Sequence, residues 1–526
     1  MKKNKLINHL LKYKARYLTL FAVLALLASY FFIYKIYIPR INAFGCFDDC
    51  FNYMGGYFML HNKHMYSDFF FNHQPLAAYL SMIIQYFTHP SSIFELLLRH
   101  RQFLILFGLF FNLFFILRFG AKMFLFTIIF EFSKFYLFGD RFLAESYIVY
   151  PIVYLAIITI YKFSNEKIFN FEYILAAIFT WFIIFSREPY IPLSLFVFFL
   201  IMIGNITFYK KLSLAIFILL SLVTIFSFNI SDFYFNVVLV NFHSVLFQEI
   251  KGQNFGGPIE ALFYPIFIFI DGPMNIFRTF LIGIDIMFII SFIKIIKDKK
   301  YLLSLIIFIV LFLSNLRPTL PGKPFYESYH LVNFYALFVL FAIFMLLQIQ
   351  KNIQLKILGL SILTVSIILF VSSPLYFANE KINQQDELIT NYGSQIQEGN
   401  VIKILSKKSD NIFMDGSEDL VYFQSQRSSE YKYTWYTGIM HSIGKYNNAR
   451  LEMFKNDPPD FYRSLGICMH KSSLDSQDIP IFAKDSYIEL LNDNKPSCLF
   501  IRKGKLSSVT QTQWKEAEKN LYTLPK

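Results

Sequence analysis

The chain has 526 residues, of which 55% are hydrophobic, 20% aromatic and only 16% charged. Soluble globular domains carry about 25% charged residues, so this composition excludes a disordered chain, a small disulfide-framework protein and an ordinary soluble enzyme. The formal net charge of +13 is assigned to cationic loops between apolar segments, as the positive-inside rule requires, and not to nucleic-acid binding. The sequence therefore predicts a polytopic α-helical membrane protein.

Apolar stretches close to the length that crosses a bilayer recur along the chain as far as residue 373. We expect about eleven membrane spans, each near the length of ~20 residues that the hydrocarbon core requires. The expected spans are residues 18–38, 102–118, 123–138, 146–162, 168–185, 191–209, 212–230, 276–296, 301–314, 330–348 and 355–373.

The distribution of cations predicts the orientation of these spans. The basic start of the chain, up to Arg16, is expected in the cytoplasm. With that start, the short basic loops also become cytoplasmic, and they include Arg118, Lys122, Lys162, Lys167, Lys210 and Lys211. The segment PLAAYLSMIIQYF (75–87) would invert this pattern if it crossed the membrane. We therefore expect it to be an interfacial helix.

The composition changes after the last expected span. Residues 375–526 are charged and contain only short apolar segments, which is typical of a small α/β domain. NIFMD (411–415) and CLFIR (498–502) are expected to be strands, and 381–407 and 486–493 are expected to be helices. An odd number of spans places this domain outside the cytoplasm. Cys468 and Cys498 lie within it, either as a disulfide or as two free thiols.

The predicted organisation is thus a membrane domain, residues 1–374, followed by an extracytoplasmic α/β domain, residues 375–526. Interfacial helices are expected on the outer face at 39–101 and 231–275. The outer loops are longer than the basic cytoplasmic loops, and they carry acids, histidines, glycines and prolines. Because connecting loops often carry catalytic and binding residues, we expect the chemistry on the outer face.

Two adjacent acids follow the first expected span. Asp48 and Asp49 begin a predicted helix close to the membrane. Charged groups there resist desolvation, so the two acids are expected to be solvated or functional. The alternative is a structural pair in the first turn, favoured by the helix dipole. The same loop later contains NHQPL (72–76), in which Pro75 suits the first turn of the interfacial helix.

The pattern FDDCFNY (47–53) followed by NHQPL resembles the first outer loop of the GT-C glycosyltransferases. The nearest resemblance is to the protein O-mannosyltransferase and lipid A aminoarabinose transferase group, in which an acid pair follows the first span and a short motif ends in Pro-Pro-Leu. Gln74 stands here where that motif has its first proline. The matching topology extends the resemblance over roughly residues 1–373.

The resemblance implies further site residues on the outer face. The family's second acid corresponds to Glu145 in FGDRFLAESY (138–147), with Asp140 as the rival position. In the family, Arg, Lys, Tyr or His side chains hold a lipid phosphate. The alternative for the Arg and Lys side chains of this sequence is that they extend to the lipid head groups. The candidates for phosphate binding are His73, Arg187, Arg317, Lys323 and His330, with Tyr326 and Tyr329 nearby.

The resemblance also implies a function. The expected enzyme moves a sugar from a polyprenyl-phosphate donor to a hydroxyl on a glycan, lipid or protein acceptor, with inversion. Asp48 is the expected base, and Asp49 or Glu145 would orient the acceptor. No cofactor is expected, and a divalent metal is an alternative that no ligand spacing requires. The expected location is a bacterial plasma membrane. The alternatives are a transporter or flippase for lipid-linked glycans and an O-antigen ligase-like protein.

Ionisable residues also occur inside the expected spans. Glu131 and Lys134 lie three residues apart, so they share one face of a helix and can pair. Asp285 lies near the middle of another expected span. Intramembrane acids are often functional, but we expect these to be polar contacts between helices.

Overall fold

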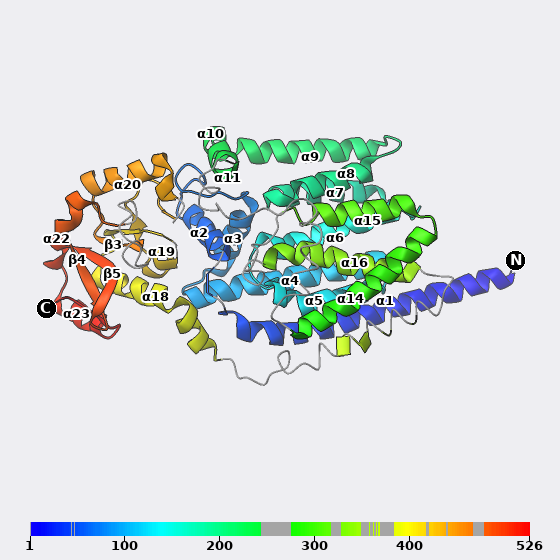
Figure 1. Ribbon diagram of the computed structural model, residues 1–526, viewed down its shortest axis with the longest axis horizontal. Coiled ribbons are helices and arrows are strands. Elements are labelled where there is room, and N and C mark those ends of the chain that lie inside the picture. The colour runs from blue at the N-terminus through cyan, green and yellow to red at the C-terminus, as the bar shows by residue number, and fades with distance from the viewer. Residues whose placement is uncertain are drawn as a thin grey trace. The chain divides into compact units, whose positions relative to one another are not determined.

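The computed structural model describes most of the chain and shows a largely helical protein with a small sheet near its C-terminal end (Figure 1). The described residues are 2–43, 45–46, 48–242, 275–316, 328–348, 383–416, 420–437, 440–465, 478–525 and the single positions 357, 361, 364, 365, 367 and 368. Most of the expected span 355–373 and the expected outer segment from residue 243 to 274 lie outside them.

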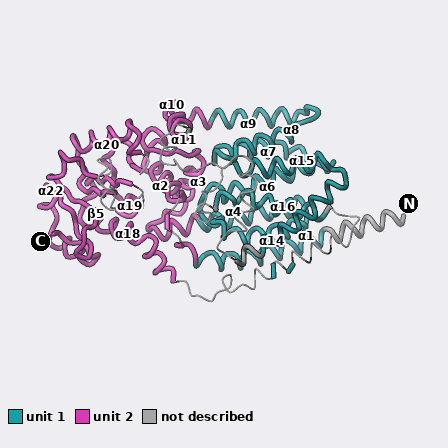
Figure 2. The backbone as a smooth tube through the Cα atoms, viewed as in Figure 1, with its two compact units in different colours: residues 1–39, 101–223, 252–382 teal, residues 40–100, 224–251, 383–526 magenta. Residues whose placement is uncertain are grey.

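The chain divides into two compact units (Figure 2). Unit 1 contains residues 1–39, 101–223 and 252–382, and unit 2 contains residues 40–100, 224–251 and 383–526. The first segment expected on the outer face and the described start of the second therefore group with the C-terminal part of the chain, and not with most of the apolar helices.

The described part of unit 1 consists of helices joined by short turns. Every expected span from 18–38 to 330–348 overlaps a helix of the structure, although the expected spans 123–138 and 191–209 extend beyond α5 and α8. These helices are α1 (Lys2–Tyr37), α4 (Ile93–Phe119), α5 (Met123–Ser133), α6 (Ala144–Phe163), α7 (Asn170–Ile184), α8 (Ile191–Met202), α9 (Phe208–Phe226), α14 (Asn275–Lys297), α15 (Tyr301–Leu313) and α16 (Val332–Gln348).

Five helical segments of the described residues are long and apolar enough to cross a membrane. They are Arg16–Arg40, Ile93–Phe119, Ala144–Phe163, Phe208–Phe226 and Tyr329–Leu347. Several other apolar helices, α7, α8 and α15 among them, are shorter than a full crossing requires. By length and composition, the protein is therefore suited to a membrane.

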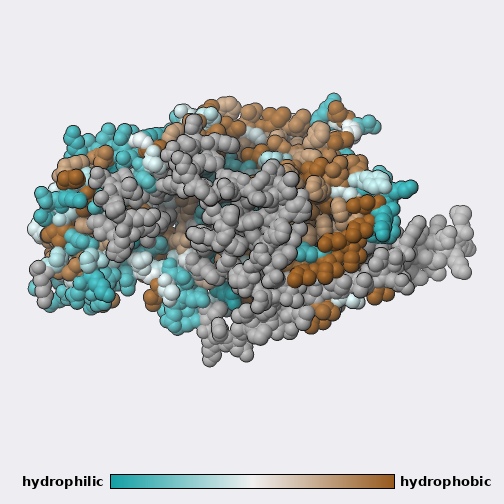
Figure 3. Space-filling model, viewed as in Figure 1, coloured by the Kyte–Doolittle hydropathy of each residue, from teal (hydrophilic) through white to brown (hydrophobic). Residues whose placement is uncertain are grey.

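The helices differ in how much of their apolar surface is covered. The apolar windows of α6 and α16 are 89% buried, whereas that of α9 is 11% buried. Helices α6 and α16 pack on each other and form the centre of unit 1. Hydrophobic side chains remain exposed along α9, including Leu219 and Phe226, and Figure 3 shows this apolar surface. An exposed apolar face of this length suits contact with lipid.

The basic loops expected in the cytoplasm meet at one end of unit 1. Arg118, at the end of α4, donates from Nη2 to the carbonyl oxygen of Lys167 at 3.0 Å. Lys162 and Lys210 both donate to the carbonyl oxygen of Ile203, just after α8. Cations near the last carbonyl groups of a helix also satisfy its unpaired acceptors. Three loops predicted to share one side thus contact one another.

A polar network lies inside unit 1 around Glu131. The ammonium group of Lys134 lies 2.7 Å from Glu131 Oε2, so the pair expected from their spacing is confirmed. Asn112 Nδ2 and Tyr150 Oη donate to Glu131 Oε1 at 2.8 and 2.7 Å. A charge removed from water is tolerated only with such partners, and the network connects α4, α5 and α6.

In unit 2, two helices of residues 40–100 pack at very short range. They are α2 (Asp48–Leu60) and α3 (Leu76–Thr88), the second of which confirms the helix expected at 75–87. A Cβ atom on Gly56 would lie 2.6 Å from the backbone nitrogen of Met82. Only a residue without a side chain permits this approach of the two helices.

The C-terminal part of unit 2 is a small α/β arrangement. The helix expected at 381–407 and the strands expected at 411–415 and 498–502 are confirmed. The elements are α18 (Gln384–Leu405), β1 (Asn411–Met414), α19 (Leu420–Ser425), β2 (Ser428–Ser429), α20 (Gly444–Asn456), β3 (Phe461–Arg463), β4 (Tyr487–Asn492), β5 (Lys495–Arg502), α23 (Gln511–Glu518) and β6 (Tyr522–Thr523).

The strands form one mixed sheet in the order β2-β1-β3-β5-β4-β6. Strand β1 runs parallel to β2 and β3, and the remaining pairs are antiparallel. The core of this part is aromatic. Phe413 stacks on Tyr462 at 5.9 Å between ring centroids, and Trp435 is fully buried. Such rings bury large apolar areas and give a small domain a stable core.

The prediction of a helix at 486–493 is wrong, because this segment forms β4. It joins β5 through Asp493 and Asn494, whose φ angles are 50° and 60°. Asp and Asn tolerate positive φ, and a two-residue turn of this kind matches the twist of an antiparallel hairpin. The backbone pairing with β5 overrides the local sequence pattern.

Replacement of Gly56 by alanine tests the close packing of α2 on α3. We expect Gly56→Ala to lower the free energy of unfolding by about 1–3 kcal/mol, because the new methyl group meets backbone that cannot move aside. Thermal unfolding of the purified protein in detergent measures this. Gly444→Ala is the matched control, since no atom lies within 4 Å of its added Cβ. Equal stability of both variants would contradict the packing argument.

Candidate functional site

Glu145 is the centre of a buried polar cluster in unit 1. Its Oε1 atom lies 3.0 Å from Arg187 Nε and 3.0 Å from His330 Nδ1. The side chains of all three residues are at most 4% exposed. The structure thus brings together one expected acid and two expected phosphate ligands, which lie 42 and 185 residues apart from Glu145 along the chain.

Each member of the cluster lies at the end of a helix. Glu145 is in the first turn of α6, where the helix dipole favours a carboxylate. Arg187 is the extended residue before the short helix Glu188–Tyr190. His330 is in the turn Ser328–Leu331 that precedes α16. Turns expected on the outer side therefore meet one another, as the cytoplasmic loops do at their own end.

The hydroxyl of Tyr190 fixes the turn Ser328–Leu331, which carries His330. It donates a hydrogen bond to the carbonyl oxygen of His330 at 3.0 Å. The ring of Tyr329 lies 4.1 Å from the His330 ring and packs against Phe138 and Leu143. The turn is thus held by a hydrogen bond to its backbone and by the packing of Tyr329, which gives the imidazole a defined position beside the carboxylate.

Asp140, the alternative to Glu145, and the other expected phosphate ligands are not part of this cluster in the described residues. Asp140 accepts from Arg101 Nη1 at 2.8 Å and is therefore engaged in a separate ion pair. Arg317 and Lys323 lie outside the described residues, as does Tyr326. His73 belongs to unit 2.

The acid pair of unit 2 occupies the first turn of α2, as expected. The two carboxylates differ in environment. The Asp48 side chain is 38% exposed and its Oδ2 atom lies 4.0 Å from Nε2 of His73. Asp49 is fully buried, and Tyr53 donates to its Oδ2 atom at 3.3 Å. Asp48 is therefore accessible to a substrate, whereas Asp49 is part of the packed interior.

A disulfide between Cys46 and Cys50 encloses this turn. It ties the chain before α2 to the first turn of the helix that carries both acids. The spacing of four residues is a signal that sequence analysis did not use. Of the other two cysteines, Cys498 is disulfide-bonded and Cys468 lies outside the described residues. Disulfides are typical of domains that fold outside the cytoplasm.

Aromatic rings surround His73. Phe51 stacks on Phe71 at 4.7 Å and contacts the imidazole edge-on at 5.4 Å, while Trp435 lies 4.5 Å from Phe51. Gln74, which replaces a family proline, is buried. These contacts hold the His73 imidazole 4.0 Å from the partly exposed carboxylate of Asp48.

The two clusters differ in the chemistry that they can perform. Glu145 has two cationic or hydrogen-bonding partners and no exposure to water, so it can orient Arg187 and His330 but is poorly placed to receive a proton from solvent. The Asp48 side chain is 38% exposed, and its Oδ2 atom faces the imidazole of His73. Within the described residues, no group of three or more His, Cys, Asp or Glu side chains is arranged to hold a metal ion.

Comparison with known protein families finds no family model that matches this sequence, and no curated protein sequence matches it.

Neutralisation of Glu145 tests the buried cluster. We expect Glu145→Gln to lower the free energy of unfolding by about 3–5 kcal/mol, because it removes the carboxylate charge that the buried Arg187 and His330 side chains face. Thermal and denaturant unfolding in detergent measure the loss. Glu166→Gln, an exposed residue in a loop of the same unit, is expected to change stability by less than about 0.5 kcal/mol. A Glu145→Gln protein as stable as this control would show that the cluster does not carry a paired charge.

Proposed function

We propose that this chain is a membrane glycosyltransferase that takes a sugar from a polyprenyl-phosphate donor and passes it to an acceptor hydroxyl on the extracytoplasmic face. The observation that carries the proposal is the meeting of Glu145, Arg187 and His330 in one buried cluster. These three residues were selected separately, from distant segments, by the resemblance to the GT-C enzymes. Their convergence on one carboxylate agrees with a shared role in one site.

Asp48 is the proposed catalytic base. An acceptor hydroxyl is a weak nucleophile at neutral pH, and a carboxylate within hydrogen-bond reach removes its proton as the hydroxyl attacks. Of the acid pair, Asp48 is exposed and Asp49 is buried beneath it. This difference divides their roles: Asp48 contacts the acceptor, and Asp49 holds the first turn of α2 through Tyr53.

The leaving group determines what the cations do. When the bond between the sugar and the phosphate breaks, negative charge grows on the phosphate oxygens, and fixed donors stabilise that charge. Arg187 and His330 are the proposed donors, and Glu145 is a positioning residue that fixes their orientation. A planar guanidinium suits phosphate because it presents parallel N–H groups. Attack from the opposite face by the acceptor would invert the sugar, with no covalent intermediate on the protein.

Two further observations support the location. Five described helical segments are suited to cross a membrane, which agrees with a lipid-linked donor. The Cys46–Cys50 disulfide lies in the loop that carries the proposed base. Since disulfides persist in oxidising compartments, this loop is proposed to face away from the cytoplasm.

Substitution of Asp48 tests the proposed base. The purified protein in lipid nanodiscs is incubated with a panel of polyprenyl-phosphate sugars and a mixture of glycan, lipid and peptide acceptors, and release of polyprenyl phosphate is measured. We expect Asp48→Asn to slow transfer by about 10²–10⁴-fold without loss of thermal stability, since the general base is removed and the fold is not.

Two neighbouring acids serve as controls for that experiment. Asp68→Asn alters an acid of the same loop that contacts only the exposed His64 among its described partners, so transfer should be unchanged. Asp49→Asn should lower the melting temperature more than Asp48→Asn does. Full transfer by Asp48→Asn, or no consumption of any donor by the wild-type protein, would overturn the proposed function.

Replacement of Arg187 by lysine tests the proposed phosphate contact. The ammonium group of lysine keeps the charge but lacks the planar fork of the guanidinium. We therefore expect Arg187→Lys to raise KM for the donor at least about tenfold and to leave KM for the acceptor within a factor of two. Equal changes in both KM values would indicate that Arg187 supports the fold without binding the donor.

A further inference from the structure

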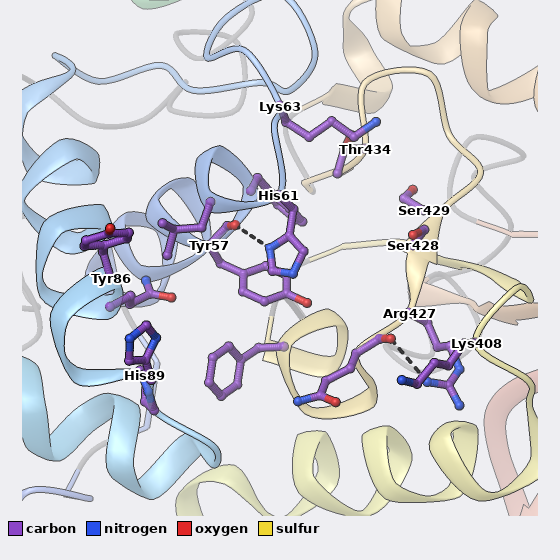
Figure 4. A pocket seen from close by; sticks show the side chains of 16 residues that line it. Tyr57, His61, Lys63, Tyr86, His89, Lys408, Arg427, Ser428, Ser429 and Thr434 are labelled. Atoms are coloured by element: carbon purple, nitrogen blue, oxygen red, sulfur yellow. Dashed lines mark hydrogen bonds between the residues drawn. The ribbon is translucent and has the colours of Figure 1, made fainter.

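Unit 2 contains a pocket of about 730 Å³ that the proposed transfer chemistry does not use. Its walls come from the last turn of α2, the end of α3 and the loops of the C-terminal sheet (Figure 4). The volume is within the range of about 300–1,000 Å³ that is typical of small-molecule sites.

The charged side chains of the pocket all have the same sign. Among the lining residues, the charged groups are Lys63, Lys408 and Arg427, and no carboxylate is present. The guanidinium of Arg427 is bound to Ser406 and to backbone carbonyl oxygens, so its role is structural. Lys63 and Lys408 therefore remain to attract a ligand, and they favour an anion.

The pocket also presents aromatic rings and polar tips. The imidazole of His61 lies 4.2 Å from the Tyr57 ring, and its Nδ1 donates to the Tyr57 carbonyl oxygen at 2.8 Å, as Figure 4 shows. Tyr86 is 60% exposed. Burial raises the pKa of the Tyr57 hydroxyl to about 12, and this hydroxyl donates to the carbonyl oxygen of Tyr422 at 3.5 Å. Flat rings beside hydroxyl and imidazole groups suit the C–H faces and hydroxyls of a sugar.

Thr434 is the most unusual residue of the pocket wall. It has a φ angle of 64°, which is rare for a β-branched residue and costs conformational energy. Its side chain is 3% exposed, and its hydroxyl has no hydrogen-bond partner among the residues that the structure describes. A buried hydroxyl without a partner is unfavourable unless a ligand supplies one. Both features point to a ligand in this pocket.

We propose that this pocket binds an acidic oligosaccharide, a sugar chain that carries carboxylate groups, as the acceptor of the transferase. Lys63 and Lys408 bind the carboxylates, Tyr57 and Tyr86 contact the sugar rings, and the Thr434 hydroxyl completes the site. Tyr57 follows Asp48 by nine residues on α2, which corresponds to ~14 Å along the helix axis. The role as acceptor rests on the proposed function, whereas binding itself does not.

Direct binding tests the pocket without any transfer reaction. The full-length protein in nanodiscs is titrated, by isothermal calorimetry, with cellobiuronic acid, with the neutral disaccharide cellobiose and with inorganic phosphate. We expect cellobiuronic acid to bind at least about tenfold more tightly than either of the other probes, because it alone combines sugar rings with a carboxylate. Its affinity should fall as salt is added, since the attraction between exposed charges is screened.

Two sets of variants locate the binding. Lys63→Gln combined with Lys408→Gln should weaken cellobiuronic acid at least about tenfold and leave cellobiose unchanged. Lys455→Gln combined with Lys515→Gln removes the same charge from exposed helix positions of unit 2 and should have no effect. Thr434→Val keeps the shape and the β-branch but loses the hydroxyl. It should bind cellobiuronic acid several-fold more weakly with a melting temperature that is unchanged or higher.

The results separate this proposal from the proposed function. Equal affinity for cellobiuronic acid and cellobiose, tighter binding of inorganic phosphate, or no loss in the Lys63 and Lys408 double variant would overturn the acidic-oligosaccharide site. Full binding by an Asp48→Asn protein that cannot transfer sugar would support the site independently. Binding by the wild-type protein with no transfer from any donor would refute only the acceptor role.

Discussion

The removal of charge from water is the constraint on which the rest of this structure depends. A carboxylate inside a helical bundle is tolerated only where cations and hydrogen-bond donors replace its hydration. Glu145 meets this condition with Arg187 and His330, and Glu131 meets it with Lys134, Asn112 and Tyr150. Because each partner comes from a different helix or turn, the polar clusters also specify which helices are neighbours.

This constraint explains why the proposed site and the stability of unit 1 are linked. The same contacts that neutralise Glu145 orient a guanidinium and an imidazole at the end of the bundle. A site assembled in this way is rigid before any substrate arrives, which lowers the cost of stabilising charge during a reaction. Substitutions in the cluster are therefore expected to affect folding as well as activity.

Unit 2 is organised by close packing and covalent linkage. Gly56 lets α2 approach α3, and the Cys46–Cys50 disulfide holds the turn that carries the acids. Helix α2 thereby becomes a fixed element with Asp48 at its start and Tyr57 near its end. The aromatic core of the C-terminal sheet supports the opposite wall of the pocket, where Thr434 keeps a strained backbone conformation.

The amino-acid sequence by itself determined the membrane character, the positions of the helices and much of the C-terminal domain. Apolar length, cationic loops and strand-like segments are local properties, so they can be read without knowledge of long-range contacts. The helix predicted at 486–493 was wrong for the complementary reason. Its strand conformation depends on pairing with β5 through the Asp493–Asn494 turn, and the grouping of 40–100 with the C-terminal part likewise depends on tertiary contacts.

The candidate site shows the same division. Glu145, Arg187 and His330 were identifiable as residue types in turns expected on the outer face, but their convergence was decided by how α6, α7 and α16 pack. The different exposure of Asp48 and Asp49, the partner of Asp140 and the basic pocket beside Tyr57 were also decided only by the tertiary structure. Local sequence specifies which groups can carry charge, whereas folding determines which of them lose water and which neighbours then compensate them.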